Sequence, residues 1–211
     1  MIIHNMEQYS PEWWSIRKGI PTASCASKIV TPTGNLSVQS RAYMNELIAD
    51  SLGFGDEPTE PTEWMTRGLE LEPEARAFYE FDSGLTVDQV GFITNDEGSA
   101  GCSPDGLIIP LIELALPEGT PNATGWECKC PKASTHIGYL LKGGLPDYYK
   151  PQVHFSMAVS GIREWVFVSY FPGLEPLIVS VEWDEYTDKI NEAIAGFTEN
   201  LAAAREKLGL S

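Results

Sequence analysis

The chain has 211 residues, 43% of them hydrophobic and 21% charged, a composition typical of a single globular domain over residues 1–211. Its formal charge of −16 argues against a broad nucleic-acid-binding surface, because such surfaces are normally basic. No apolar run is long enough to span a bilayer and no signal peptide is visible, so we expect a cytoplasmic protein that does not bind membranes.

Cysteine usage and the distribution of basic residues refine this picture. No C-x-x-C pair is present, so we expect reduced thiols in a cytosolic protein. Basic side chains gather in two windows, which leaves room for a local basic groove on an acidic body. These windows hold Arg17, Lys18, Lys28 and Arg41, and Lys129, Lys132, Lys142 and Lys150.

The first part of the chain predicts helices. In MEQYSPEWWSIRKGI, Ser10 is the expected cap of a short helix and Pro11 its first residue. A long helix over residues 62–84 is expected to bury a face marked by Leu71, Ala75 and Phe78, which are spaced i, i+4, i+7. Further helices are predicted from Thr22 over residues 22–30 and over 37–54, with an acidic, Pro-rich and mobile loop at 56–63.

The second part predicts a sheet. Strands are expected at residues 85–98, 101–116 and 126–130 and, as a hairpin, at 164–171 and 176–183. Helices are expected at residues 136–144, 148–161 and 184–209, with a loop at 117–125. This order predicts an α/β or α+β fold, a central mixed sheet flanked by helices.

The predicted strand WECKC carries the first sign of chemistry. Side chains of a strand alternate between two faces, so Glu127 and Lys129 share one face, with Trp126, Cys128 and Cys130 on the other. A carboxylate beside a lysine suits phosphodiester hydrolysis. The carboxylate would hold a divalent cation that polarises the phosphate and acidifies a bound water.

The lysine would position that water or stabilise the charge that develops on the phosphate. A second carboxylate is needed to fix the cation, and Asp105 in the turn SPDG supplies it. A Glu–Lys pair alone equally fits an ordinary half-exposed strand. The Pro-Asp turn upstream makes the nuclease interpretation more specific.

Several blocks of the sequence together resemble one family. SPDG…ECKCP resembles the P-D…(D/E)-x-K signature of the PD-(D/E)XK nuclease superfamily. Four further segments resemble blocks of the phage lambda exonuclease family of viral recombinases, and their order is kept between Trp13 and Ser160. They are WWSIRKGIPTAS, GLELEPEARAFYEFDSG, GCSPDGL and YYKPQVHFSMAVSG. The resemblance implies a restriction-endonuclease-like core.

The resemblance also implies roles for residues of the site. Asp105, Glu127 and the backbone carbonyl of Cys128 would bind metal, and Lys129 would orient the attacking water. Glu72 would lie near the metals. On its own, Glu72 is better interpreted as the i+4 helix partner of an arginine.

Three more residues match positions of the family that contact DNA. Gln152 would lie beside the nucleophile or the scissile phosphate, although a lone glutamine is usually a surface residue. Arg17 and Ser24 would bind the terminal 5′-phosphate, since a guanidinium can form two hydrogen bonds to one phosphate. Thr22 and Ser24 also stand at a predicted helix start, where free N–H groups attract anions, but Thr22 equally suits a capping role.

The activity implied is a Mg²⁺-dependent 5′→3′ exonuclease on linear double-stranded DNA, with Mn²⁺ as a substitute metal. It would act as a homotrimeric ring and pass its 3′ overhangs to a phage single-strand annealing protein. No G-x-x-x-x-G-K-[ST] motif is present, so no ATP requirement is expected. The segment 110–125 is longer than its counterpart in the family and predicts altered contacts with DNA, a partner or a neighbouring subunit.

Two alternatives remain open from the sequence. One is a structure-specific or restriction-type endonuclease of the same superfamily, which would cut closed circular DNA. The other is an inactive DNA-end-binding module on a nuclease scaffold, because a fold does not determine function.

Overall fold

The computed structural model describes residues 1–55, 62–110 and 122–210. The predicted mobile loop at 56–63 and the extended segment at 110–125 lie mostly outside the described residues. None of the described helices is long and apolar enough to cross a membrane.

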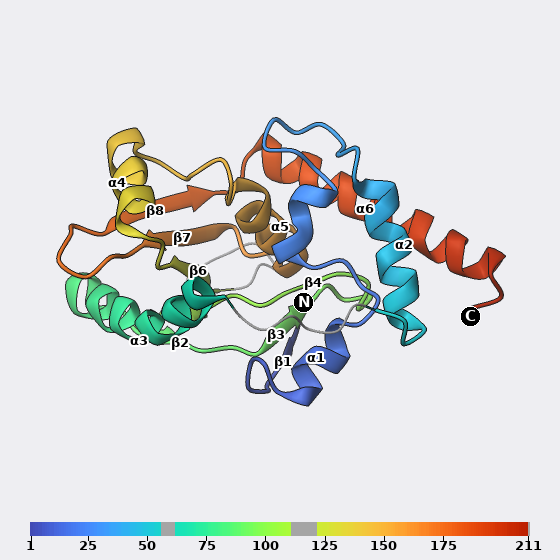
Figure 1. The fold of residues 1–211 in the computed structure, drawn as a ribbon, viewed down its shortest axis with the longest axis horizontal. Coiled ribbons are helices and arrows are strands. Elements are labelled where there is room, and N and C mark those ends of the chain that lie inside the picture. Colours follow the sequence, from blue (N-terminus) through green and yellow to red (C-terminus); the bar gives the residue numbers. More distant parts are fainter. Residues whose placement is uncertain (56–61, 111–121, 211) are drawn as a thin grey trace.

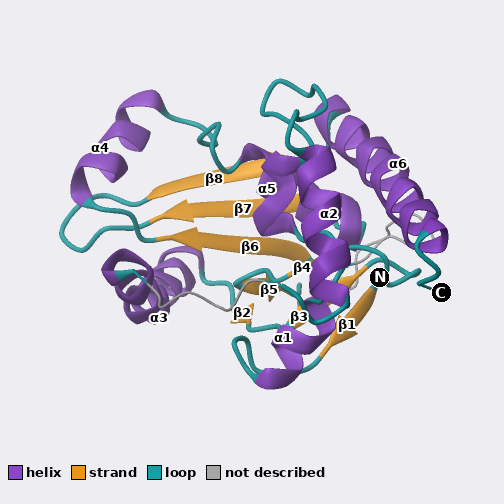
Figure 2. Ribbon diagram, turned by 45° about the vertical axis from the view of Figure 1, so that its right-hand side comes forward, coloured by secondary structure: helices purple, strands orange, loops and turns teal. Residues whose placement is uncertain are grey.

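The strands of this part of the chain form two sheets. They are β1 (Ile2–His4), β2 (Val87–Asp88), β3 (Phe92–Thr94), β4 (Gly101–Cys102), β5 (Gly106–Ile108), β6 (Thr124–Lys129), β7 (Glu164–Ser169) and β8 (Leu177–Glu182). The larger sheet has the order β2-β5-β6-β7-β8, in which β6 and β7 are parallel and the other neighbours antiparallel (Figure 2). A small antiparallel sheet has the order β1-β3-β4. The predicted central mixed sheet is thus confirmed.

Helices flank the larger sheet on both sides (Figure 1). They are α1 (Pro11–Arg17), the 3₁₀ helix η1 (Ala23–Lys28), α2 (Ser40–Ser51), α3 (Glu63–Ser83), α4 (Ala133–Lys142), α5 (Lys150–Ser160) and α6 (Glu185–Lys207). The connection between the parallel strands β6 and β7 runs through α4 and α5. This long crossover is what a parallel pair requires.

Side chains cap the starts of α1 and α6, whereas the capping role considered for Thr22 is not observed. The Ser10 side chain accepts a hydrogen bond from the Trp13 N–H at 3.2 Å, so Ser10 caps α1 as predicted. Asp184 caps α6 and forms a capping box with Thr187. The helix predicted from Thr22 is a 3₁₀ helix, and the Thr22 side chain makes no cap hydrogen bond.

Two predicted strands are wrong in extent. The segment 85–98 is divided between β2 and β3, which pair in different sheets. Gly91 lies at the division, where a Cβ would stand 2.3 Å from the Met6 carbonyl oxygen, so the N-terminal segment passes too closely for any side chain. The described part of the segment 101–116, residues 101–110, is likewise divided into β4 and β5 at Pro104, which lacks the N–H that a continuous strand would need.

The buried face of α3 also differs from the prediction. Ala75 is fully buried and Tyr79 is 5% exposed, whereas Phe78 is 37% exposed, with its ring centre 6.1 Å from that of Tyr170. The buried positions are thus spaced i, i+4 along the helix. Phe78 lies one residue before Tyr79 and therefore beside that stripe, where its side chain is more exposed.

Two core clusters lie on opposite faces of the larger sheet. The main core packs β7 side chains such as Trp165 and Phe167 against α5, α6, α2 and η1. The second core packs Trp126 and Cys128 of β6 against Ala75 and Tyr79 of α3. Consequently β6 has a helix on each side, α3 on one face and α5 on the other (Figure 1).

Candidate active site

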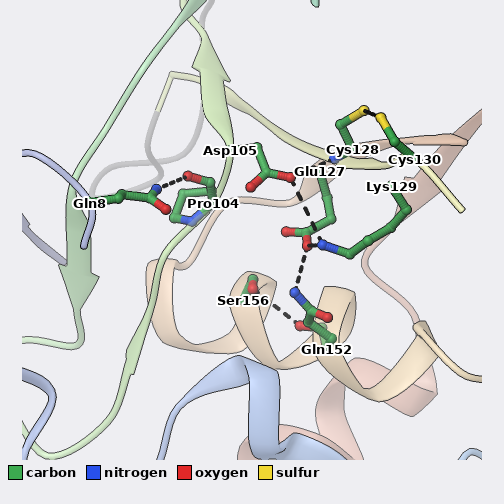
Figure 3. Close-up of polar contacts among 9 residues, drawn as sticks. All are labelled: Gln8, Pro104, Asp105, Glu127, Cys128, Lys129, Cys130, Gln152 and Ser156. Atoms are coloured by element: carbon green, nitrogen blue, oxygen red, sulfur yellow. Dashed lines mark hydrogen bonds and ion pairs between the residues drawn. The ribbon is translucent and has the colours of Figure 1, made fainter. Parts of the chain in front are cut away.

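The polar side chains of β6 point away from the second core. Glu127 and Lys129 share one face and form an ion pair, as the alternation of WECKC predicts (Figure 3). Gln152, from the first half of α5, donates from its Nε2 to Glu127 Oε1 at 2.5 Å. Glu127 is therefore held from its own strand and from the facing helix, and only 1% of its surface is exposed.

Asp105 joins this group from the neighbouring strand. Its Oδ2 accepts a hydrogen bond from the Cys128 N–H at 2.7 Å and lies 4.0 Å from Lys129 Nζ. The residue immediately precedes β5, and β5 pairs with β6 so that Gly106 faces Trp126. The hairpin therefore brings together the Pro-Asp turn and the E-x-K strand predicted from the sequence.

Burial raises the proton affinity of the carboxylates in this group. Burial raises the pKa of Glu127 to about 7, with Asp105 and Glu72 adding to the shift and Lys129 opposing it. The pKa of Asp105 is also raised by burial. Burial opposes the charge of Lys129, but Glu127 and Asp105 outweigh it and hold the pKa of its ammonium above the ordinary value.

Glu72 reaches the group from α3, as the resemblance predicts. Burial, with Asp105 adding to the shift, raises the pKa of Glu72 to about 7, while Arg76 and Lys129 oppose it. Glu72, Asp105 and Lys129 line one cavity of about 980 Å³. The charges of Arg76 and Asp105 both act on Glu72, but none of the ion pairs among the described residues joins Glu72 to Arg76.

The donors of this site fit a hard divalent cation. Among the residues that the structure describes, no group of three or more His, Cys, Asp and Glu side chains could by itself hold a metal ion. Mg²⁺ does not need such a group, since it usually binds one or two carboxylates and completes its shell with water and substrate phosphate. Asp105, Glu127 and the Cys128 carbonyl offer oxygen ligands of this kind. The pKa values of the two carboxylates are raised chiefly by burial, so a bound cation would favour their ionised forms.

A second polar cluster surrounds Arg17, at the end of α1. Its guanidinium donates to Ser103 Oγ at 2.9 Å and to Ser24 Oγ at 3.4 Å, and its Cζ lies 4.0 Å from the centre of the Trp13 ring. None of the ion pairs among the described residues includes Arg17. A guanidinium held by hydroxyl groups and an aromatic ring, with no carboxylate partner, is suited to receive an anion.

Thr22 lies beside this cluster but is largely covered. Its hydroxyl is 3.2 Å from Ser24 Oγ, its N–H donates to the Tyr43 hydroxyl, and 5% of its surface is exposed. Ser24 and Gln152 line one smaller cavity of about 250 Å³. The cluster around Arg17 and the group around Glu127 are thus neighbours.

Sequence reasoning missed three residues of this site. Ser103 accepts hydrogen bonds from both Arg17 and the Trp13 indole, and its place in CSPDG could have indicated it. Tyr149 lines the larger cavity, with its ring centre 5.7 Å from Lys129 Nζ. Tyr9 lines the same cavity from the N-terminal segment, and no sequence pattern indicates this.

A hairpin that joins an Asp, a Glu and a Lys, beside a cluster prepared for an anion, defines a nuclease site. The comparisons agree with this class. The chain belongs to the YqaJ-like viral recombinase domain family, whose model matches residues 12–163. Among curated proteins, no sequence is significantly similar to it.

Solved structures of exonucleases have a similar fold. An alkaline exonuclease from Laribacter hongkongensis is 30% identical with a TM-score of 0.77, and the match covers 95% of this chain and 96% of that one. The same exonuclease in complex with dAMP is 28% identical with a TM-score of 0.71, over 95% and 98% of the two chains. A phage-related exonuclease from Haemophilus somnus 129PT shares the fold at 15% identity, with a TM-score of 0.61 over 92% and 99%.

Proposed function

We propose that this protein is a Mg²⁺-dependent, ATP-independent 5′→3′ exonuclease on linear double-stranded DNA. It releases mononucleotides from the 5′-ended strand and leaves a 3′ overhang. Membership of the viral recombinase family and the similarity to an alkaline exonuclease support the nuclease activity. The observation that carries the proposal is the anion-ready cluster of Arg17, Ser24 and Ser103 next to the catalytic carboxylates and Lys129.

The catalytic group divides the work of hydrolysis among its side chains. Asp105, Glu127 and the Cys128 carbonyl hold the metal, for which Mn²⁺ is a substitute, and a bound Mg²⁺ supplies a Lewis acid that acidifies water. Lys129 is fully charged at neutral pH, so its ammonium can orient the attacking water and stabilise the charge that develops on the phosphate. Gln152 fixes the rotamer of Glu127.

The cluster around Arg17 gives the reaction its direction. A terminal 5′-phosphate carries more charge than an internal phosphodiester, so a guanidinium with two hydroxyl neighbours favours the chain end. Because this cluster adjoins the catalytic group, a captured 5′ end presents its first phosphodiester to Lys129 and Asp105. A closed circle contains only internal phosphodiesters, each with a single negative charge, so it offers no terminal phosphate for this cluster to bind.

Partners and assembly are part of the proposal and follow from the resemblance to the lambda exonuclease family. The protein acts as a homotrimeric ring in the cytoplasm of a phage-infected or prophage-carrying bacterium. It passes its 3′ overhang to a phage single-strand annealing protein. The net charge of −16 suits such a ring, because attraction to phosphate is then confined to the few basic residues near the site.

The test is digestion of linear 5′-phosphorylated duplex DNA with Mg²⁺ and no ATP. Parallel samples carry 5′-hydroxyl ends, closed circular DNA, EDTA, or the Lys129→Ala protein, with Lys207→Ala at the end of α6 as a matched control. We expect 5′-mononucleotides from the wild type and Lys207→Ala, slower digestion of 5′-hydroxyl ends, and no digestion in the other samples. Nicked circles would establish an endonuclease, and intact linear DNA throughout would leave an inactive end-binding module.

A further inference from the structure

Tyr9 has an unusual backbone conformation. Its φ is 67°, and among the described residues no other non-glycine residue has a positive φ. A bulky side chain is strained in this region, so the surrounding structure must hold it there. Such outliers concentrate at functional sites, which raises the question of what the Tyr9 side chain does.

The neighbours of Tyr9 fix this conformation from both sides. The Gln8 side chain donates to the carbonyl oxygens of Val90 and Pro104, each at 2.9 Å. Figure 3 shows the Gln8–Pro104 contact directly beside Asp105. On the other side of Tyr9 in the chain, Ser10 is fixed in place because its side chain caps α1. The turn at Tyr9 is therefore tied to the same Pro-Asp segment that supplies a catalytic carboxylate.

The strained conformation does not serve to bury the ring. Tyr9 remains 54% exposed, and it lines the cavity that contains Asp105, Glu72 and Lys129. Trp14 and Trp64 line the same cavity and are 43% and 55% exposed. The Tyr9 ring centre lies 5.1 Å from that of Trp13 and 6.4 Å from that of Trp14, so it is backed by other rings.

The side chains that line this cavity, among them Tyr9, Trp14 and Trp64, indicate the kind of ligand that it binds. Exposed aromatic rings beside a site for phosphodiester cleavage match the parts of a nucleotide, because an unpaired base stacks on aromatic side chains while its phosphate meets cations and metal. Such stacking tolerates every base. Lys129 and Lys132 line the same cavity and supply positive charge for the phosphates. A cavity lined by aromatic rings and lysines therefore suits a nuclease that cuts without regard to sequence.

We propose that Tyr9, supported by Trp14, stacks on a base of the DNA strand being cut and thereby places the adjacent phosphate at Asp105 and Lys129. This inference rests on the proposed nuclease function. Tyr9 is a binding residue in this role, and its ring rather than its hydroxyl group is what matters. The hydroxyl remains protonated at neutral pH, since burial and the carboxylates of Asp105 and Glu72 raise the pKa of Tyr9.

Binding of a 5′-phosphorylated single-stranded oligonucleotide, without divalent metal and in the Lys129→Ala background, tests this role apart from cleavage. Tyr9→Ala should weaken binding roughly five- to a hundredfold, the range for one stacked base. Tyr9→Phe should bind within about twofold of the parent, because the ring is kept. The matched control is Phe81→Ala, since Phe81 is a 91% exposed aromatic residue on α3 that does not line the cavity.

Melting temperatures and cleavage rates complete the test. Tyr9→Gly should bind as weakly as Tyr9→Ala but melt at a higher temperature, because both lack the ring and only glycine accepts this φ without strain. With Lys129 restored, Tyr9→Ala should raise KM on linear duplex DNA more than it lowers kcat. Unchanged binding by Tyr9→Ala, or equal losses in Tyr9→Phe and Tyr9→Ala, would overturn the stacking role. Absence of cleavage by the wild type would instead refute the nuclease proposal and leave the binding result to decide the role of the ring.

Discussion

At the scale of single residues, the site is a group of carboxylates with too little positive charge around it. Glu127, Glu72 and Asp105 all have raised pKa values in the metal-free protein, chiefly because they are buried. Lys129 compensates only in part. This imbalance is what a divalent cation would correct, and it makes the stability of the metal-free protein depend on pH.

The first prediction concerns that pH dependence. The folded protein retains protons on Glu127 and Glu72 up to about pH 7, whereas the unfolded chain loses them near the ordinary value of 4.5. The free energy of unfolding should therefore fall as pH rises, by about 1 kcal/mol between pH 6.5 and 8. His154, whose pKa burial lowers to about 4, gives the opposite slope, but only below its ordinary value of 6.5.

Urea denaturation at pH 6.5 and pH 8 measures this effect. Mg²⁺ should reduce the difference, because a cation replaces the protons. Glu127→Gln should also reduce it, whereas the exposed Glu206→Gln on α6 should not. Equal unfolding free energies at the two pH values in metal-free wild type would contradict the electrostatic account.

The second prediction concerns Gln152. Its amide is a hydrogen-bond donor to a buried carboxylate, a contact typically worth about 1.5–3 kcal/mol. Gln152→Ala should lower kcat about ten- to a hundredfold, because Glu127 would lose the contact that fixes its rotamer. Exposed Gln39 before α2 provides the control, and Gln39→Ala should keep wild-type rates. A Gln152→Ala enzyme with normal kcat would exclude the positioning role.

At the scale of elements, β6 matters most because it carries both Glu127 and Lys129. Its packing against β7 is tight at Gly125, which faces Trp165 across the parallel pair. A Cβ at Gly125 would lie 2.1 Å from the Trp165 ring. The position therefore requires glycine for reasons of space.

The third prediction follows from this contact. Gly125→Ala should destabilise the protein by about 1–3 kcal/mol, and activity should fall as β6 shifts. The matched control is Gly138→Ala in the middle of α4, where nothing lies within 4 Å of an added Cβ. That change should instead stabilise by about 0.5–1 kcal/mol, since alanine favours a helix. Thermal denaturation measures the melting temperatures of both variants. Similar changes in melting temperature for Gly125→Ala and Gly138→Ala would show that Trp165 can move aside for a Cβ at residue 125.

The elements differ in how well the sequence could predict them. The helices α1 to α6 and the hairpin of β7 and β8 were predictable from the chain alone, although α4 begins at Ala133, three residues before its predicted start. The strands β1 to β5 have only two or three residues each, too few for a pattern. Their division at Gly91 and Pro104 depends on contacts with the N-terminal segment, which lies far away in the sequence.

The same distinction holds for the candidate site. Asp105, Glu127 and Lys129 lie in short motifs, and the period of a strand already places two of them on one face. Tyr9 enters the site through the path of the N-terminal segment, which the sequence does not reveal, whereas Ser103 stands in CSPDG and could have been indicated by that motif. The prediction that Phe78 is buried was wrong. Ala75 can share a helix face with Phe78 at i+3 or with Tyr79 at i+4, and the sequence pattern does not decide between them.

At the scale of the whole molecule, one core joins distant parts of the chain. The main core contains Ala23 and Ile48 from the first quarter, Phe167 from the sheet and Leu201 from α6. The second core shares the strands β5 and β7 with the main core, since each strand places side chains in both. Neither core can form without the sheet, so both should be lost together when the sheet unfolds.

The last prediction is therefore a single cooperative unfolding transition for residues 1–211. Far-UV circular dichroism reports the helices, and fluorescence reports the six tryptophans, which include Trp126 in one core and Trp165 in the other. The two signals should share one urea midpoint, because Trp126 and Trp165 are neighbours along β6 and β7 rather than members of separate units. Measurements at several protein concentrations provide the control, since an oligomer would shift both midpoints equally. Two separate midpoints would show that α3 and its core form an independent unit, and the single-domain prediction would then be wrong.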